Sequence, residues 1–461
     1  MSGVILPENT ATEVVEPEQV SARVGTGSDV LSAARLGPLG YSLADQVLAV
    51  GGMFVVNIAL ARVRTKEEYG IFALSFSVFT FLSGLHNAAI LEAYTIYGAG
   101  RYHRRFADYG RLLWRSNGWL LAGLSALLLV IWQSLRWLHP AFASPALLGM
   151  ALTCGVLLTA SFVRRTFYMR QRPDLAVRFS AAFFVSCMLL LALAIRADLL
   201  NGLSAFLIVA LAWGIAALFI LRERPGRIVS ADGTDFLLQE PGYWSEHWNY
   251  SRWVFVTALV FQFTTQAYFW VVAGVLSVRH VAELRAMYNL ALPADQIFAA
   301  TTLLVLPQMA LQFAAQEFGN LRHLWRQCSL MFLTISAIFA LGVGLGSLPL
   351  LHVVYGGKFD SVSPLLRWYV LLPVVMGVGH AANAALKAIE KPQTVFYAYL
   401  TSGVTTFALG IPLVMYLGLR GAVYGMLLSG ASYAVVLGFS FYRFSRPKSA
   451  DLAIFAGNSE S

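Results

Sequence analysis

The chain has 461 residues, of which 58% are hydrophobic and only 12% are charged, and its mean hydropathy is +0.65. Typical soluble domains are about 25% charged, so this composition excludes a cytoplasmic enzyme, a secreted protein and a disordered scaffold. The formal net charge is +9. The basic residues lie mostly in short loops between apolar runs, which indicates membrane topology and not nucleic-acid binding.

Residues 1–40 are polar and lack the apolar core of a signal peptide, so we predict a disordered cytoplasmic tail there. Twelve apolar runs follow, each close to the 20 or so residues that a transmembrane helix needs. Helices are required because lipid offers backbone amides no other partner. We therefore predict an all-α polytopic membrane protein with about 12 helices, at 42–63, 70–97, 115–135, 145–163, 176–195, 202–221, 252–277, 286–311, 328–351, 364–387, 394–416 and 421–442.

The two halves of the chain resemble each other. Gln46 and Gln262 lie 216 residues apart, and Pro173 and Pro392, each after a basic residue, lie 219 apart. Repeats of six helices keep one orientation, and such repeats place the substrate site between them near the midplane. The predicted parts are an N-tail (1–40), an N-lobe of six helices (41–222), a cytoplasmic linker (223–250), a C-lobe of six helices (251–443) and a cytoplasmic C-tail (444–461).

Lys and Arg are more than twice as frequent in the loops on the side of the N-terminus as in the alternate loops. Cytoplasmic loops carry this excess, so both termini are predicted to be cytoplasmic.

Polar side chains inside the spans follow single helix faces. Gln46 and Asn57, eleven residues apart, share a face of the first span. Such groups are costly in lipid and usually face a water-filled cavity, although for any one residue hydrogen bonding between helices remains the alternative. The candidate cavity residues are Gln46, Asn57, Arg62, Asn87, Glu92, Arg115, Arg164, Arg165, Gln262, Gln266, Arg285, Asn289, Gln296, His380, Asn383 and Lys387.

Two carboxylates are candidates for coupling transport to a proton or sodium ion. Asp45 lies near the cytoplasmic end of the first span, and Asp295 lies inside the eighth. Either could instead be a structural carboxylate. Arg115, Arg164 and Arg165 lie at cytoplasmic helix ends, where they either anchor the helices or bind a phosphate headgroup, since the planar guanidinium binds phosphate oxygens in pairs.

Several motifs fail for lack of context. Gly356-Gly357-Lys358 lacks the upstream glycine and the following Ser or Thr of a phosphate-binding loop, so no ATP hydrolysis and no cofactor is expected. The three cysteines lie inside apolar runs and have no metal-ligand spacing. No Ser/His/Asp or zinc constellation is found, and we expect no catalytic residues.

Three segments resemble the polysaccharide transporters of the multidrug/oligosaccharidyl-lipid/polysaccharide (MOP) exporter superfamily. Residues 45–74, with Asp45-Gln46, Ala61-Arg62 and Glu68-Tyr69-Gly70, resemble the first hairpin of that family. Residues 353–377 resemble its segment between helices 9 and 10, and the Arg-Arg…Arg-Pro loop at 164–173 resembles its helix 4–5 connection. The resemblance covers about residues 41–443.

The resemblance implies a central cavity lined mainly by the first, second, seventh and eighth spans, and transport by alternating access. The implied activity is that of a non-enzymatic flippase in the bacterial inner membrane that moves a polyprenyl-diphosphate-linked oligosaccharide for exopolysaccharide, capsule or O-antigen. Membrane lipids and polysaccharide polymerase or export proteins are the implied partners. Few Arg or Lys lie deep in the spans, which allows a weakly charged or neutral glycan.

Two rival hypotheses remain. A cation-coupled multidrug antiporter of the same superfamily would depend on a membrane carboxylate such as Asp45. A membrane glycan polymerase would need a large catalytic loop, whereas the predicted outer loops are each under about 20 residues.

Overall fold

The computed structural model describes residues 33–99, 102, 105–138, 143–222, 243–389 and 391–445. The predicted N-tail before Ala33, the linker residues 223–242 and the C-tail after Ser445 lie outside the described residues. Within the described part the elements are all helical, and eleven segments are long and apolar enough to cross a membrane. The helix at 278–314 makes a twelfth pass in chain order, and the predicted fold class is confirmed.

Six passes form the first half of the described chain. They are α2 (Ala33–Val63), then α3 (Lys66–His86) joined by a π-helical turn (Asn87–Leu91) to α4 (Glu92–Ala99), α5 (Phe106–Leu138), α6 (Pro145–Met169), α7 (Pro173–Arg196) and α8 (Gly202–Arg222).

Six further passes form the second half. They are α9 (Tyr243–Val275), α10 (Val278–Ala314), α11 (Phe318–Leu345), α13 (Ser363–Tyr369) with α14 (Leu371–Ala388), α15 (Pro392–Thr405) joined by a π-helical turn (Thr406–Gly410) to α16 (Ile411–Leu417), and α17 (Leu419–Phe444). Between α11 and α13 lie α12 (Ser347–Tyr355) and a 3-10 turn (Asp360–Val362).

Local signals explain where several helices begin. Thr65 and Ser144 have extended backbones, and each side-chain oxygen accepts a hydrogen bond from the backbone N–H three residues on. This is the N-cap geometry that Ser and Thr favour. Pro173 and Pro392 occupy the first turn of α7 and α15, where the missing N–H costs nothing.

Five helices begin eight to ten residues earlier than the apolar runs predict. α2 starts at Ala33, inside the predicted N-tail, and α10 starts at Val278, whereas the predicted spans start at 42 and 286. α5, α9 and α11 start at Phe106, Tyr243 and Phe318, whereas the predicted spans start at 115, 252 and 328. The extra turns of these last three helices are polar, and hydropathy marks only the part of a helix that crosses hydrocarbon.

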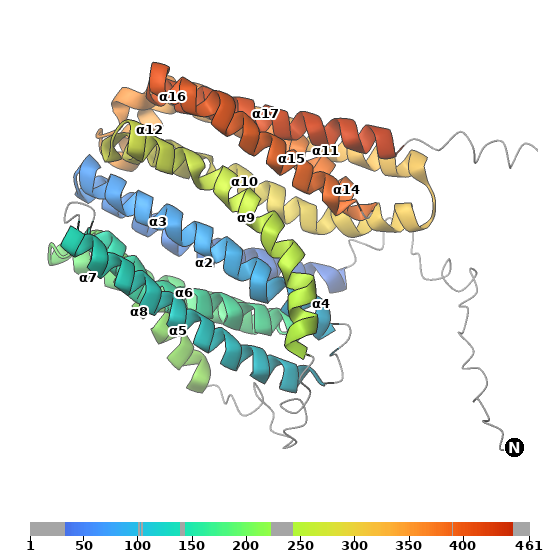
Figure 1. Cartoon of the computed structure of the whole chain (residues 1–461), viewed down its shortest axis with the longest axis horizontal. Coiled ribbons are helices and arrows are strands. Elements are labelled where there is room, and N and C mark those ends of the chain that lie inside the picture. Colours follow the sequence, from blue (N-terminus) through green and yellow to red (C-terminus); the bar gives the residue numbers. More distant parts are fainter. Residues whose placement is uncertain are drawn as a thin grey trace, which may run out of the picture.

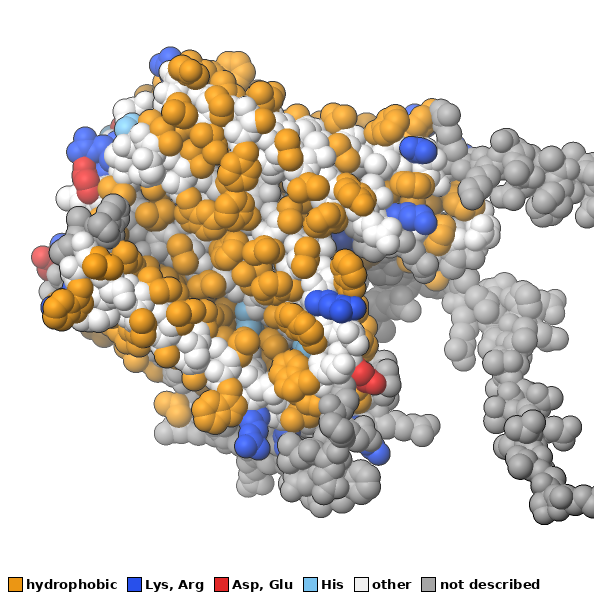
Figure 2. Space-filling view, in the orientation of Figure 1, with side chains coloured by type: hydrophobic (Ala, Val, Ile, Leu, Met, Phe, Trp, Pro, Cys, Tyr) orange, Lys and Arg blue, Asp and Glu red, His pale blue; other side chains and the backbone are white. Residues whose placement is uncertain are grey.

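Both described ends of the chain lie on one side of the bundle, here called the terminal side, and the loop between α2 and α3 lies on the opposite, far side (Figure 1). The surface in Figure 2 is broadly apolar between the two sides, and Lys, Arg, Asp and Glu gather toward its ends. This distribution is the one expected for a bundle surrounded by lipid.

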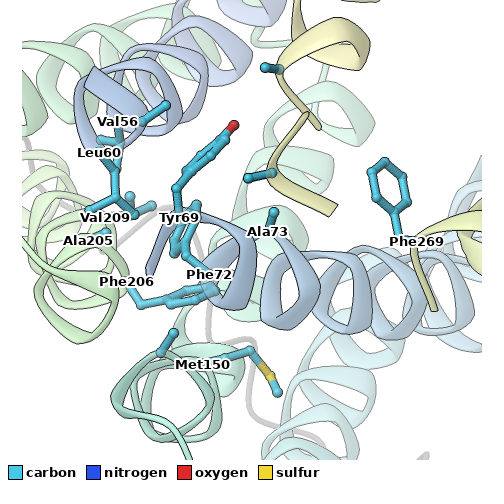
Figure 3. Close-up of a cluster of buried hydrophobic side chains, with 14 of the residues drawn as sticks. Val56, Leu60, Tyr69, Phe72, Ala73, Met150, Ala205, Phe206, Val209 and Phe269 are labelled. Atoms are coloured by element: carbon cyan, nitrogen blue, oxygen red, sulfur yellow. The ribbon is translucent and has the colours of Figure 1, made fainter. Parts of the chain in front are cut away.

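The N-lobe is held together by a buried cluster around α3. Figure 3 shows Tyr69 and Phe72 between residues of α2 and α8, and Phe72 lies 5.0 Å from Phe206 between ring centroids. Tyr69, Phe72 and Phe206 are fully buried, and burial of each aromatic side chain contributes about 1.5–3 kcal/mol. The first turns of α3 are therefore fixed to α2 and α8 of the N-lobe.

The first turns of α9 pack against the N-lobe and not against the C-lobe. His247 lies between the Tyr109 hydroxyl, at 3.0 Å from Nδ1, and the Ala89 carbonyl, at 2.9 Å from Nε2. The Tyr102 hydroxyl donates to the Glu246 carboxylate at 2.7 Å. α9 then crosses toward α10 and α15 (Figure 1), so one helix joins both lobes.

Candidate functional site

A cavity of about 280 Å³ lies between the two lobes. Its walls come from α2, α3, α6, α7 and α8 of the N-lobe and from α10 of the C-lobe. Four of the predicted cavity residues line it together: Asn57, Arg164, Arg285 and Asn289. The rest of its lining is mainly aliphatic and aromatic, so these four side chains, with four hydroxyl groups, supply its polar character.

Arg285 is buried in this wall without a carboxylate partner. Its side chain is 4% exposed, and its guanidinium carbon lies 4.5 Å from the ring centroid of Phe76, 4.9 Å from that of Tyr288 and 5.6 Å from that of Phe269. Within the described part of the chain, no carboxylate lies within 4.0 Å of it, and its Nε makes no hydrogen bond. Aromatic faces attract a cation without cancelling its charge, so Arg285 presents a positive charge at the cavity.

Arg164, in contrast to Arg285, has its charge neutralised by a carboxylate. Its Nη2 and Nε donate to the two carboxylate oxygens of Asp45 at 2.6 and 3.2 Å. The hydroxyls of Tyr168 and Ser180 also donate to that carboxylate, at 2.6 and 2.5 Å. Asp45 is 1% exposed, and in this conformation it joins α2, α6 and α7.

Two asparagines complete the polar wall. Asn289 donates from Nδ2 to the Tyr69 hydroxyl at 2.9 Å, which joins α10 to α3. Asn57 donates to its own helix at the Met53 carbonyl, and its Oδ1 is buried without a partner. A buried acceptor without a donor is costly, and a bound hydroxyl group would satisfy it.

A second polar group lies nearer the terminal side. Arg165 donates from Nη2 to Asn87 Oδ1 at 3.1 Å. The Glu92 carboxylate is within electrostatic range of both Arg165 and Lys387. Lys387 belongs to α14 of the C-lobe, so these four predicted residues bring charges of the two lobes together.

Other predicted residues belong to the C-lobe interior or to α9. Asn383 donates to the Tyr433 hydroxyl at 2.9 Å, and His380 lies 5.5 Å from Phe298 between ring centroids. Asp295 is partly buried on α10 and makes no hydrogen bond or ion pair within the described residues. Gln262 lies against Gly84 of α3, and Gln266 is buried with its Oε1 unpaired.

Three predicted residues lie outside the cavity on the exposed surface. Gln46 is exposed and reaches Gln296 only at 3.4 Å. Arg62 lies on the far side and donates to the Val353 carbonyl at 3.2 Å. Arg115 is exposed on α5.

The far side is closed by contacts that the sequence analysis did not find. Lys358 Nζ donates to the backbone carbonyls of Arg62 and Arg64 at 2.6 and 2.7 Å. Lys66 pairs with Glu283 at 2.7 Å. The Gly356-Gly357 turn, with both φ angles positive, aims Lys358 at the N-lobe, and this turn was the one available signal.

The terminal side is joined differently. Among the described residues, the Gln46–Gln296 contact is the one hydrogen bond that links α2–α8 to α10–α17 on that side. The other terminal-side links run through the first turns of α9. Apart from α9, the lobes are therefore bonded on the far side and nearly unbonded on the terminal side.

No protein-family model and no curated protein matches the chain, but solved structures do. An inward-facing multidrug resistance MATE family transporter of the MOP superfamily superposes with a TM-score of 0.73 and 13% identity over 87% of this chain and 94% of that chain. An outward-facing MATE family transporter gives 0.63 and 11% identity over 88% and 95%.

A MOP superfamily transporter from Pyrococcus furiosus, described as having a binding pocket of reverse polarity that suggests a different function, gives a TM-score of 0.63 and 11% identity over 88% of this chain and 94% of that chain. At these identities the comparisons establish the fold, which is that of MOP superfamily transporters. The neighbours described as MATE transporters do not support the polysaccharide branch.

Proposed function

We propose that the chain is a multi-pass membrane transporter that works by alternating access and carries a cargo with an anionic headgroup. The cargo that fits best is an oligosaccharide linked to a polyprenyl diphosphate, moved from the cytoplasmic leaflet of a bacterial inner membrane. The terminal side would face the cytoplasm, in agreement with the excess of Lys and Arg in its loops. The contacts of Lys358 and Lys66 that close the far side, here called the far-side seal, support an inward-facing state. The higher TM-score with the inward-facing neighbour supports the same state.

One observation is the main support for an anionic cargo, namely the charge of Arg285. The cavity wall holds two arginines, and only Arg164 has a carboxylate partner. The cavity is thus electropositive in a region of low dielectric, where charges interact more strongly than in water. A diphosphate would gain charge-assisted hydrogen bonds from the guanidinium, and sugar hydroxyls would satisfy Asn57.

A multidrug exporter is the second candidate, because the most similar transporters above are described as multidrug resistance proteins. A cationic drug in the same cavity would meet the unpaired guanidinium of Arg285, and like charges repel. The Asp45 carboxylate, which would have to attract such a drug, is occupied by three side chains. The polarity of the cavity therefore favours the anionic cargo.

Binding by the purified chain tests the proposal. We expect polyprenyl diphosphate to bind and ethidium, a cationic drug, not to bind. Arg285→Gln should weaken polyprenyl diphosphate binding by roughly 10- to 150-fold, since a hydrogen bond to a charged group contributes about 1.5–3 kcal/mol. Arg115→Gln, an exposed arginine on α5, is the control and should bind normally.

Ethidium binding that strengthens in Arg285→Gln, with no binding of the diphosphate to either protein, would favour the multidrug candidate. In cells, deletion should cause lipid-linked oligosaccharides to accumulate in the inner leaflet. Normal surface polysaccharide after deletion, without a redundant flippase, would contradict the proposal. Coupling to a proton or sodium ion, through Asp45 or Asp295, remains a separate proposal.

A further inference from the structure

A second cavity, of about 800 Å³, lies between α5, α6 and α8. Its volume is within the roughly 300–1,000 Å³ of ordinary ligand sites. It lies on a different face of α6 from the central cavity, and Trp213 borders both. Nothing in the proposed function uses this space.

The lining of the second cavity suits a hydrocarbon chain. Most of it is aromatic or aliphatic, with Leu121, Phe162, Phe179 and Trp213 among the buried members. On α5 it runs from Phe106 to Ser125, which is about 28 Å at 1.5 Å per residue. One leaflet of a bilayer core is about 15 Å thick, so the cavity is long enough for an acyl chain.

The cavity opens toward the lipid side of the bundle. The apolar window of α5 is only 11% buried, and Trp114 and Leu152, which both line the cavity, are about half exposed. A lipid chain could therefore enter from the membrane without crossing the protein. α6 lies between this cavity and the central one, with different residues in the two walls, and Trp213 forms part of both walls.

The two basic residues of the lining are Arg111, near the start of α5, and Arg170, directly after α6, so both belong to its terminal end. Asp108 pairs with Nη2 of Arg111 at 2.6 Å, while Nε of Arg111 is buried without a hydrogen bond. The terminal end is at the level expected for headgroups. A guanidinium has five N–H donors and binds phosphate oxygens well, so Arg111 can bind a phosphate while it keeps its bond to Asp108.

We infer that this cavity binds an anionic phospholipid of the bilayer, with an acyl chain between α5, α6 and α8 and the phosphate at Arg111 and Arg170. The lipid is not the cargo, because α6 and Trp213 stand between this cavity and the central one. It supplies apolar contacts that α5 lacks within the chain. The inference is independent of the proposed function.

Two glycines give a test that fills the cavity without disturbing packing. A Cβ at Gly118 or Gly214, which both line the cavity, would meet no atom within 4 Å. Gly118→Phe and Gly214→Phe should therefore fold but occupy the space of the lipid. Gly123→Phe is the matched control, because Gly123 is also on α5 and equally open but does not line the cavity.

The readouts are native mass spectrometry of the full chain and its melting temperature in detergent. Phosphatidylglycerol should co-purify with the unmodified chain and with Gly123→Phe, and be lost from Gly118→Phe and Gly214→Phe. Added phosphatidylglycerol should raise the melting temperature more than phosphatidylcholine does, and Arg111→Gln should remove this difference. Inorganic phosphate alone should have no effect.

Equal retention of phosphatidylglycerol by all the glycine variants would overturn the inference. So would displacement of the phospholipid by polyprenyl phosphate, which would make the site one for the cargo anchor. A melting temperature that responds equally to both phospholipids would overturn the role of Arg111 and Arg170.

Discussion

Replacing Gly70 with alanine tests whether the far-side seal holds the described conformation. Gly70 is buried on α3, and a Cβ there would lie 1.8 Å from the carbonyl oxygen of Val278 on α10 and 2.7 Å from its carbonyl carbon. Contacts below 3.0 Å essentially do not occur for real Cβ atoms, and both obstructing atoms are backbone. α3 and α10 must therefore move apart, and overpacking of this kind costs about 1–3 kcal/mol.

That cost applies only to a conformation in which α3 and α10 touch. In a transporter with two conformations, a differential free energy of about 1–3 kcal/mol changes the ratio of the two by roughly 5- to 150-fold. We expect Gly70→Ala to shift the population toward a state that is open on the far side.

Distances between spin labels measure this shift. Leu199, in the far-side loop between α7 and α8, and Tyr416, in the last turn of α16, are both exposed, and the label distance between them should lengthen in Gly70→Ala. Gly274→Ala is the control, since a Cβ there would meet no atom within 4 Å. An unchanged distance distribution and an unchanged melting temperature in Gly70→Ala would refute the reasoning.

Two further substitutions test contacts within the N-lobe and between the N-lobe and α9. Asp45→Asn should lower the free energy of unfolding by about 3–5 kcal/mol, because it leaves Arg164 without a counter-charge; a melting temperature equal to that of the unmodified chain would contradict this. His247→Ala removes the contacts to Tyr109 and to the Ala89 carbonyl, so amide hydrogen exchange in residues 243–251 should speed up by roughly 5- to 150-fold, for about 1–3 kcal/mol of lost stability. An unchanged exchange rate would show that the first turns of α9 are held by other contacts.

The number of passes could be predicted because a span must supply about 20 apolar residues in one run. Helix starts such as those at Pro173 and Pro392 could also be predicted, since proline fits the first turn. The early starts of α5, α9 and α11 were not, because their first turns are polar and gain their partners from other helices. His247, for example, depends on Tyr109 and Ala89, both more than 130 residues away.

The cavity was predictable as a set of polar residues but not as a set of neighbours. Arg164 and Arg165 are adjacent in sequence and were treated alike, yet they point about 100° apart on α6. Arg164 reaches Asp45 on α2, and Arg165 reaches Asn87 after α3. Only the packing of three helices decides which arginine is neutralised, and one chain's sequence does not encode that directly.

Arg285 shows why residue type alone does not give the charge of the cavity. A lone arginine in a span is costly to bury, and a carboxylate partner would be the ordinary solution. Here Phe76, Phe269 and Tyr288 surround the guanidinium instead. A carboxylate would lower the cost of burial by cancelling the charge, whereas ring faces lower it and leave the charge in place for a phosphate.

The same contrast bears on how the lobes could move. Arg285 and Asn289 of α10 contact Phe76 and Tyr69 of α3, so the cavity wall is assembled from both lobes only while the far side is closed. If the lobes separated there, Arg285 would lose the Phe76 face and a bound phosphate would lose part of the environment that favours it. Opening the far side would thus weaken the grip on an anionic headgroup at the point where it must be released, which is the differential affinity that alternating access requires.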